Sequence, residues 1–357
     1  NMPKTIRNEY YKKLSYESLM QAHLESRKGK STRKEIIQFS LKQEEYIMWL
    51  CEQLKNRTYR HSGYTSFYVT EQKLRRIEKS IYIDRIVHRW YVDNFMQEHF
   101  VKSFSYSSFA CLKGKGMHNA CLYVQEMMKH CKRIWNNYYV IKMDVAKYFQ
   151  NIDKQILYEI LCRKIKDKNL LWLSREILYS NGVDKGLPIG NYTSQCFANI
   201  YLNELDQYMK HKLKLKYTCR YMDDVVALVN TKEEAIEKLN LIRSFLKDKL
   251  CLELNRKTQI FKSTQGVNFC GYKINEYRLK IRDKGKRKLK KKVKILEKQV
   301  KQGKMICIEA HKYLSGYLGY INVANTKKLR KQAICNRCIN IYSIDDFNEK
   351  YKIQYKE

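Results

Sequence analysis

The first part of the chain carries the hydrophobic spacing of helices, interrupted by one short strand. Residues 9–60 are expected to be mostly helical, with mixed apolar and basic faces. Residues 64–70, Tyr-Thr-Ser-Phe-Tyr-Val-Thr, combine aromatic and β-branched types and predict a strand. A basic turn at 73–76 is expected to follow, and then a helix from about Asp84 to His99.

The middle of the chain alternates apolar strand runs with helical patterns. In chain order, the predicted elements are a strand at 138–144, helices at 154–181 and 193–215, a hairpin over 217–230, a helix at about 232–249 and a strand pair near 252–274. Such an alternation favours an α+β fold in which a small antiparallel sheet is backed by helices.

The last part, about 285–357, is predicted to be helical and is very basic. Between Lys286 and Lys304 the apolar residues fall at intervals that form one narrow stripe on a helix: Leu289, Val293, Leu296 and Val300. Lysines cover the remaining faces. The helix either packs this stripe on a bundle and leaves the lysines in solvent, or its lysines follow a duplex backbone. The two interpretations are compatible.

The charge balance changes the picture most. Lys and Arg number 71 against 36 Asp and Glu, which gives a formal net charge of +35. Such an excess repels itself unless a polyanion binds, and phosphate backbone is the usual partner. A membrane surface is the competing partner, but no run of about 18 or more apolar residues and no lipidation signature is present. We therefore expect a cytoplasmic protein that binds nucleic acid and no membrane.

The twelve cysteines are scattered without the spacing of a disulfide framework, which suits a reducing compartment. The one tight pair is Cys335 with Cys338. A single Cys-x-x-Cys without a second pair is weak support for zinc, and buried or incidental thiols are the simpler interpretation.

Three aspartates are placed where a metal-dependent phosphoryl transfer needs them. Asp144 ends a buried strand, and Asp223-Asp224 lies at the turn of an apolar hairpin. Adjacent acids in apolar surroundings repel each other and lose solvation, a cost that a cation offsets. Two Mg²⁺ ions held by carboxylates can activate a 3′-hydroxyl and stabilise a pyrophosphate leaving group. An ordinary surface turn is the alternative for Asp223-Asp224.

Several segments resemble the motifs of reverse transcriptases, in the order and spacing of that family from about 60 to 330. They are Lys73-x-Arg75-x-Ile77, Asp84 to His88, Lys142 to Phe149 with Asp144, Gly186 to Gln195, Tyr221-Met222-Asp223-Asp224, Leu254 to Thr258, and Phe269-Cys270-Gly271-Tyr272. The resemblance implies an RNA-directed DNA polymerase with a right-hand fold. Its implied limits are fingers at 1–135 with an N-terminal helical extension, palm at 136–275 with part of the fingers within 155–190, and a basic helical thumb at 276–357.

The resemblance also implies roles for individual residues. The metal positions are Asp144, Val145, Asp223 and Asp224, with Mg²⁺ as the expected ion, Mn²⁺ as a substitute and dNTPs as substrates. Lys257 is the implied proton donor to pyrophosphate. The implied nucleotide-contacting residues are Lys73, Arg75, Phe149 as a ribose gate, Ile189, Gly190 and Gln195. Asn191 and Ser194 either contact the ligand or cap the following helix.

One departure from the family pattern is informative. The central loop has Ile189 where many retroviral and intron enzymes have glutamine. This resembles the reverse transcriptases of diversity-generating retroelements, as do Gly114 to His118 and Gly316 to Tyr320. An aliphatic side chain cannot hydrogen-bond the incoming base pair, which predicts weaker discrimination. Alternatively, Ile189 only packs under the loop.

The implied partners are a template RNA, a primer or cDNA strand and an accessory variability protein. The closest rival role is a bacterial antiphage-defence or abortive-infection polymerase that makes templated or untemplated DNA. A non-catalytic RNA-binding splicing cofactor is the rival from another class, but such a protein does not need the three aspartates that this sequence contains.

Overall fold

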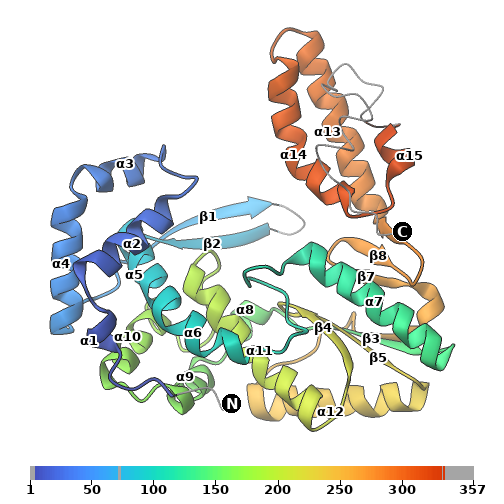
Figure 1. Ribbon diagram of the computed structural model, residues 1–357, viewed down its shortest axis with the longest axis horizontal. Coiled ribbons are helices and arrows are strands. Elements are labelled where there is room, and N and C mark those ends of the chain that lie inside the picture. The colour runs from blue at the N-terminus through green and yellow to red at the C-terminus, as the bar shows by residue number, and fades with distance from the viewer. Residues whose placement is uncertain (1–4, 71–73, 332, 334–357) are drawn as a thin grey trace. The chain divides into compact units, whose positions relative to one another are not determined.

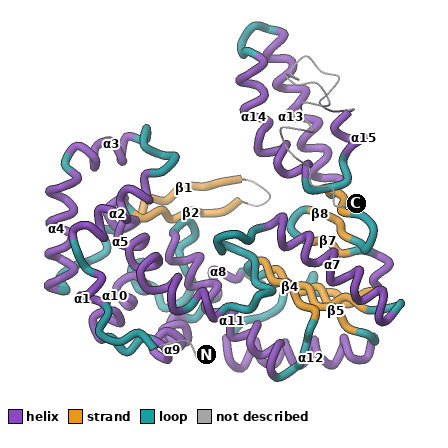
Figure 2. The backbone as a smooth tube through the Cα atoms, viewed as in Figure 1, coloured by secondary structure: helices purple, strands orange, loops and turns teal. Residues whose placement is uncertain are grey.

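The computed structural model describes residues 5–70, 74–331 and 333. Helices make up most of this part, and the strands form three small sheets (Figures 1 and 2). The α+β class predicted from the sequence is therefore confirmed. Contacts divide the chain into two discontinuous compact units. The first consists of the chain up to Leu112, Asp144–Lys214 and Lys238–Lys257, and the second of Lys113–Met143, Leu215–Glu237 and the chain from Thr258 onward. The limits of fingers, palm and thumb stay predictions.

The first unit begins with a group of helices, as the sequence predicts for 9–60. They are α1 (Tyr10–Lys13), α2 (Tyr16–Arg27), α3 (Lys34–Leu41) and α4 (Gln43–Asn56). Ser15 caps α2 in a reciprocal exchange with Ser18, whose N donates to the Ser15 Oγ at 3.1 Å. Arg57, with a φ of 58°, ends α4 in a left-handed conformation.

A two-stranded hairpin follows, formed by β1 (Tyr64–Thr70) and β2 (Leu74–Ser80), which pair antiparallel. The predicted basic turn at 73–76 is wrong for its last three residues, because Leu74, Arg75 and Arg76 pair with β1 and belong to β2. Lys73 lies outside the described residues. The helix predicted after the hairpin is confirmed. It consists of α5 (Tyr82–Tyr91), the π-helical turn η1 (Val92–Met96) and α6 (Gln97–His99), and the short 3₁₀ turn η2 (Val101–Ser103) follows it.

The rest of the first unit is helical around α11. Its elements are α8 (Tyr148–Asn151), α9 (Lys154–Lys164), α10 (Lys168–Leu178) and α11 (Tyr192–His211). The single helical stretch predicted at 154–181 is two helices. The backbone is extended at Ile165, and Asp167 then starts α10 by accepting hydrogen bonds from the N–H groups of Asn169 and Leu170.

The second unit contains a four-stranded sheet in the order β4-β5-β3-β6. Its strands are β3 (Tyr139–Asp144), β4 (Tyr217–Tyr221), β5 (Asp224–Val229) and β6 (Gln259–Lys262). The pairs β4/β5 and β3/β6 are antiparallel. The structure adds α7 (Met117–Trp135), which the sequence patterns do not predict and which packs on β4. The predicted helix at 232–249 is α12 (Lys232–Leu250), of which only the part up to Glu237 belongs to the second unit.

The strand pair predicted near 252–274 is only partly correct, because β6 pairs with β3 instead of with its neighbour along the chain. After the 3₁₀ turn η3 (Ser263–Gln265), a separate three-stranded sheet consists of β7 (Val267–Phe269), β8 (Tyr272–Ile274) and β9 (Leu279–Ile281). It leads into α13 (Asp283–Lys301), α14 (Cys307–Asn322) and α15 (Lys327–Arg330).

The predicted apolar stripe of α13 is confirmed. Leu289, Val293 and Leu296 are each 1% exposed, Val300 is half-buried, and α13 packs against α14. No helix among the described residues combines the length and hydropathy needed to cross a membrane. Cys335 and Cys338 lie outside the described residues.

Candidate metal and nucleotide site

Asp223 and Asp224 are fixed by a tight turn between β4 and β5. Tyr221 pairs with Asp224 across the hairpin, so the turn consists of Met222 and Asp223 alone. Met222 has a φ of 55°, a left-handed conformation that costs a residue with a side chain about 1–2 kcal/mol. The buried Arg220 stabilises this turn, since its Nη1 donates to the Met222 carbonyl oxygen at 3.2 Å. Asp224 is thus the first residue of β5, and the turn lies one position earlier than the sequence predicts.

Asp224 forms an ion pair with the neighbouring strand. β5 and β3 are adjacent in the sheet, and Lys142 of β3 places its Nζ against the Asp224 carboxylate. The same ammonium lies 5.2 Å from the centre of the Phe269 ring. Because strand residues alternate between faces, Lys142 lies on the same face of β3 as Asp144. The ion pair therefore locates Asp224 beside the last residues of β3.

Asp144 ends β3, and the segment after α12 runs along its main chain. The Asp144 carbonyl oxygen accepts from the Asn255 N–H at 2.6 Å, and the Ala146 N–H donates to the Glu253 carbonyl oxygen at 2.8 Å. The Asn255 Oδ1 accepts from the Lys257 N–H at 3.1 Å. This last bond closes a turn on which Lys257 is exposed. The implied proton donor thus lies on the segment that pairs with Asp144.

Phe149 and the loop that begins at Gly186 are joined through the main chain. Phe149 lies in α8, and its carbonyl oxygen accepts from the Leu187 N–H at 2.7 Å. Gly186 has a φ of 88°, and a Cβ at this position would lie 3.0 Å from the Gln150 carbonyl oxygen. A side chain does not fit there without strain. The first half of the loop is therefore anchored on the helix that carries Phe149.

The second half of the same loop is anchored on β2. The Glu78 N–H donates to the Ile189 carbonyl oxygen at 2.9 Å. Gly190 approaches the strand so closely that a Cβ would lie 2.8 Å from the Ile77 Cγ2. Arg75 is exposed three residues before Glu78 on this strand. The structure thus places Arg75, Ile189 and Gly190 on one connected part of the first unit.

The first turns of α11 carry Gln195, which is exposed. Asn191 occupies the N-cap position of α11, yet its side chain makes no capping hydrogen bond. It is 2% exposed and bonds to β2 instead. The alternative that Asn191 caps α11 is therefore wrong. Val145, one of the implied metal positions, is 2% exposed and pairs through its main chain with Leu254.

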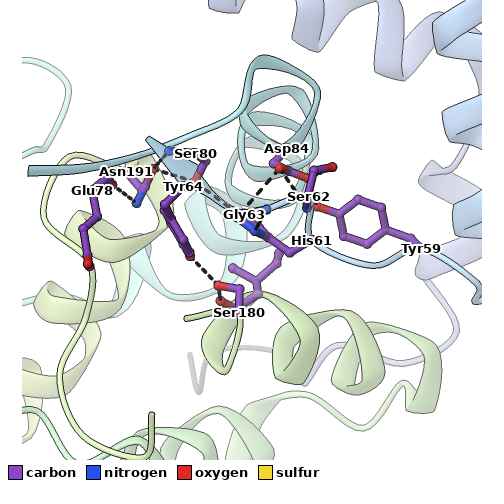
Figure 3. A network of polar contacts seen from close by, with 11 residues as sticks. Tyr59, His61, Ser62, Gly63, Tyr64, Glu78, Ser80, Asp84, Ser180 and Asn191 are labelled. Atoms are coloured by element: carbon purple, nitrogen blue, oxygen red, sulfur yellow. Dashed lines mark hydrogen bonds and ion pairs between the residues drawn. The ribbon is translucent and has the colours of Figure 1, made fainter. Parts of the chain in front are cut away.

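A buried polar network supports the base of the β1/β2 hairpin (Figure 3). The Asp84 Oδ1 accepts from the Tyr59 hydroxyl at 2.7 Å, and the Ser62 N–H reaches both carboxylate oxygens, at 3.2 and 3.1 Å. The His61 Nε2 lies 3.2 Å from the Ser80 Oγ and 3.8 Å from the Asp84 Oδ2. Burial raises the pKa of Asp84, and burial also lowers the pKa of His61 although Asp84 opposes that shift.

The donor types at the ends of the central strands fit a divalent metal ion, since carboxylate oxygens are the ligands that hard cations prefer. However, no group of three or more His, Cys, Asp or Glu side chains within the described residues is arranged to hold a metal. The Lys142 ammonium contacts the Asp224 carboxylate instead. Lys142 therefore competes with a metal ion for one oxygen of the Asp224 carboxylate.

Lys142 received no role from the sequence motifs, and the side-chain contacts of Asn191 were not predicted from the sequence. A signal for Lys142 was present, because it is the one charged residue before Asp144 in the otherwise apolar run Tyr139–Met143. Nothing in the sequence indicates that Asn191 bonds to β2, because β2 and Asn191 are far apart along the chain.

Comparison with known protein families gives one match of more than half the chain. The sequence profile described as "Reverse transcriptase (RNA-dependent DNA polymerase)" matches residues 70–274. This range includes Arg75, the loop at 186–195, both acidic motifs and Lys257.

Individual relatives are more distant. A putative COX1/OXI3 intron 2 protein of Saccharomyces cerevisiae is 25% identical over 237 residues, which is 48% of this chain and 27% of that protein. The retron Ec73 reverse transcriptase of Escherichia coli is 28% identical over 201 residues, 52% of this chain and 61% of that protein. The chain thus spans less than two thirds of the length of these relatives. A structure of telomerase from Candida albicans with a fragment of telomeric RNA has a TM-score of 0.49 at 10% identity, covering 88% of this chain and 64% of that one.

Proposed function

Because the chain belongs to the reverse transcriptase (RNA-dependent DNA polymerase) family, we propose that it is a polymerase that copies an RNA template into complementary DNA. The observation that carries this proposal is the placement of the acids. Asp144 ends β3. Asp224 begins β5, the neighbouring strand of the same sheet, and Asp223 lies in the turn just before it. The proposed partners are a template RNA and a primer or cDNA strand, and the substrates are dNTPs.

We propose that Asp144, Asp223 and Asp224 hold the metal ions, with Val145 beside them. The expected ion is Mg²⁺, and Mn²⁺ is a substitute for it. Bound in this way, the ions would activate the primer 3′-hydroxyl and stabilise the pyrophosphate leaving group. The strained Met222 turn gives the two adjacent acids a fixed direction. The Lys142 ammonium, which pairs with the Asp224 carboxylate, offsets part of the negative charge of the two adjacent acids.

The other residues receive roles on the nucleotide side. Arg75, together with Lys73, binds the triphosphate, which arginine can contact through two hydrogen bonds. Phe149 excludes a ribose 2′-hydroxyl, and the Ile189–Gly190 backbone with Gln195 forms the surface under the incoming nucleotide. Lys257, exposed on the turn beside Asp144, donates a proton to the pyrophosphate, a contribution of about 10²–10⁴-fold for a general acid.

Within the family, we propose that the enzyme belongs with diversity-generating retroelements. The support is Ile189, whose aliphatic side chain cannot hydrogen-bond the template–nucleotide pair. Its carbonyl oxygen is engaged on β2, where it accepts from the Glu78 N–H at 2.9 Å. Discrimination at this position then rests on shape, which predicts errors in copying. An accessory variability protein and a structured template RNA are the partners that this branch requires.

The test is primer extension on a defined RNA template with Mg²⁺ and dNTPs, comparing wild type with Asp223→Ala. Asp248→Ala, at an exposed acid of α12, is the matched control. We expect template-complementary cDNA from wild type and control. Asp223→Ala should lower the rate by about 10³-fold, since electrostatic stabilisation of the transition state is lost. Equal rates in wild type and Asp223→Ala would rule out the assigned acids.

Sequencing the product tests the finer proposal. Errors concentrated opposite template adenines would support the diversity-generating branch, and uniform fidelity would contradict it. DNA that does not follow the supplied template would instead favour the defence polymerase. RNA binding without any synthesis, in the presence of cell extract, would favour the non-catalytic RNA-binding protein.

A further inference from the structure

Asn191 is an unusual buried side chain because it bonds to a strand instead of to its own helix. Its Oδ1 accepts from the Ser80 N–H at 3.0 Å and from the Ser80 Oγ at 2.7 Å. Its Nδ2 donates to the Glu78 carbonyl oxygen at 2.9 Å. Figure 3 shows this side chain lying against Glu78 and Ser80. We call these three contacts the Asn191 bridge.

The Asn191 bridge extends a pairing that the loop main chain begins. The Glu78 N–H donates to the Ile189 carbonyl oxygen at 2.9 Å, so three successive polar groups on this edge of β2 are satisfied: the Glu78 N–H, the Glu78 carbonyl and the Ser80 N–H. The opposite edge of β2 pairs with β1. The side-chain amide thus replaces a peptide group of a neighbouring strand.

The close packing of Gly190 on β2 also holds the loop against this strand. A Cβ at Gly190 would lie 2.8 Å from the Ile77 Cγ2 and 3.5 Å from the Glu78 carbonyl oxygen. The loop backbone therefore touches β2 with no room for a side chain between them. Glycine is needed here for contact with the strand, independently of any contact with a ligand.

The direction of the Ser80 hydroxyl is set by His61. The His61 Nδ1 accepts from the Gly63 N–H at 3.0 Å, so the proton of the neutral ring is on Nε2. The Nε2–H can then donate to the Ser80 Oγ at 3.2 Å, which leaves the Ser80 hydroxyl to donate to the Asn191 Oδ1. The direction of each hydrogen bond in this row is fixed by the previous one.

We propose that Asn191 is a positioning residue that locks the Ile189–Gly190 loop to the edge of β2, so that the loop and the Arg75 strand receive the incoming nucleotide as one rigid surface. This inference rests on the proposed function for the identity of the ligand. The mechanical part, that Asn191 holds the loop on β2, stands on the contacts alone. Without the bridge, the loop and Arg75 would sample separate positions, and nucleotide binding would weaken more than the chemical step.

Hydrogen exchange measured by mass spectrometry tests the mechanical part. In Asn191→Ala, the Ser80 N–H loses its acceptor and the Glu78 N–H loses the support of the loop. We expect peptides covering 74–80 to exchange about tenfold faster or more than in wild type. The matched control is Asn203→Ala, which removes the same side chain from a half-buried position of α11, where it bonds within the helix to Gln207. Exchange in 74–80 equal to that of the control would overturn the proposal.

Steady-state extension with the same variants tests the positioning part. We expect the KM for dNTP to rise about tenfold in Asn191→Ala, with kcat and the Kd for the RNA template–primer changed less than about twofold. A fall in kcat at constant KM would overturn the positioning role even if exchange increases. Absence of synthesis by wild type would count against the proposed function, whereas the exchange result judges the bridge independently.

Ser80→Ala provides a second variant in case Asn191→Ala fails to fold. It removes the Oγ, which donates to Asn191 and accepts from His61, and leaves the two main-chain contacts of the bridge. A smaller rise in KM, about threefold, is therefore expected. Combined with Asn191→Ala, it should add little to the single change, because both act through one contact. Full additivity, or no effect of Ser80→Ala on either exchange or KM, would contradict the bridge.

Discussion

His88 is a buried histidine without a polar partner, beside the network that supports β2. It is 2% exposed, and neither ring nitrogen has a hydrogen-bond partner within the described part of the chain. Its ring stacks on His61 at 5.4 Å between centroids. Burial, with smaller effects of His61 and Arg85, lowers the pKa of His88 to about 3. The folded protein therefore keeps this ring neutral at every physiological pH.

This lowered pKa predicts loss of stability in mild acid. Below an unfolded-state pKa of about 6.5, the unfolded chain binds a proton at His88 that the folded chain does not. The free energy of unfolding should therefore fall as the pH drops from about 7.5 to 5.5, by up to about 1.4 kcal/mol per pH unit for one histidine. The slope of the free energy of unfolding against pH should be smaller in His88→Phe. Denaturant unfolding at several pH values measures both slopes.

His61 complicates this test and also supplies its control. Its pKa is likewise lowered by burial, so His88→Phe should retain part of the pH dependence. A variant at the exposed His211 should keep the full dependence. A slope in His88→Phe equal to that of wild type would mean that the ring gains a proton without unfolding.

At the scale of residues, the sequence identifies the acids but not what they touch. Asp144, Asp223 and Asp224 could be singled out because acids in apolar strands need a cation. The partner of Asp224 could not, because the Lys142 contact depends on β5 lying next to β3. Likewise, the two alternatives predicted for Asn191 were a helix cap and a ligand contact. Bonding to β2 was not among them, because β2 is distant along the chain.

At the scale of elements, the β7/β8 hairpin shows how a short turn depends on a helix that follows much later. Its two turn residues, Cys270 and Gly271, have φ values of 46° and 88°. The Tyr320 hydroxyl of α14 donates to the Gly271 carbonyl oxygen at 2.6 Å, and the Tyr272 hydroxyl donates to the Tyr320 carbonyl oxygen at 2.7 Å. The turn and α14 are thus joined by two reciprocal hydrogen bonds.

A side chain at Gly271 should break this junction. A Cβ there would lie 2.8 Å from the Tyr320 hydroxyl, and the positive φ disfavours any L-residue. We expect Gly271→Ala to lower the free energy of unfolding by about 1–3 kcal/mol. Tyr320→Phe removes the hydroxyl that the new methyl group would meet. The double variant should therefore lose less free energy of unfolding than the sum of the two single variants. Thermal unfolding of all four proteins measures these differences. Additive losses would show that the contact between residue 271 and the Tyr320 hydroxyl does not matter.

Elements were predictable where a local pattern is complete. The helices at 10–56, β1, β3 and the stripe of α13 follow from spacing and residue type. The pairing of β6 with β3 does not, because apolar runs show that strands exist but not which strand is the partner. Asp167 divides a helical stretch through its hydrogen bonds to two N–H groups, a capping signal that a period of 3.6 residues does not contain.

At the scale of the whole molecule, the excess of positive charge is concentrated in part on α13. Its buried stripe faces α14, and exposed lysines occupy the opposite side of the helix. These lysines are Lys288, Lys291, Lys294 and Lys298. Such a row is suited to a phosphate backbone, and binding through it would release counterions.

Salt titration of RNA binding tests this surface. With several phosphate contacts, affinity should fall by about 10³-fold or more between about 50 and 200 mM salt. Changing the four α13 lysines to Gln should flatten the plot of log affinity against log salt. The control changes four exposed lysines in and between α2, α3 and α4, with the same loss of charge: Lys28, Lys30, Lys34 and Lys42. Equal flattening by both sets would show that net charge alone matters.

The sequence predicts the class of the whole molecule and its type of partner, since composition and motif order bear on both. It does not predict that each compact unit is assembled from separate segments of the chain. That arrangement depends on which segments contact one another in space, and neither periodicity nor charge records such contacts.

The strand order β4-β5-β3-β6 has a consequence for how the protein is made. β3 ends at Asp144, whereas its two neighbours begin only at Asp224 and Gln259. At about 5–20 residues per second, a ribosome needs roughly 6–24 s to supply both partners. During that time the apolar run Tyr139–Met143 has two unpaired edges, a state that favours association with other chains. The yield of folded protein should therefore increase when chaperones are supplied or when the protein is synthesised at low temperature.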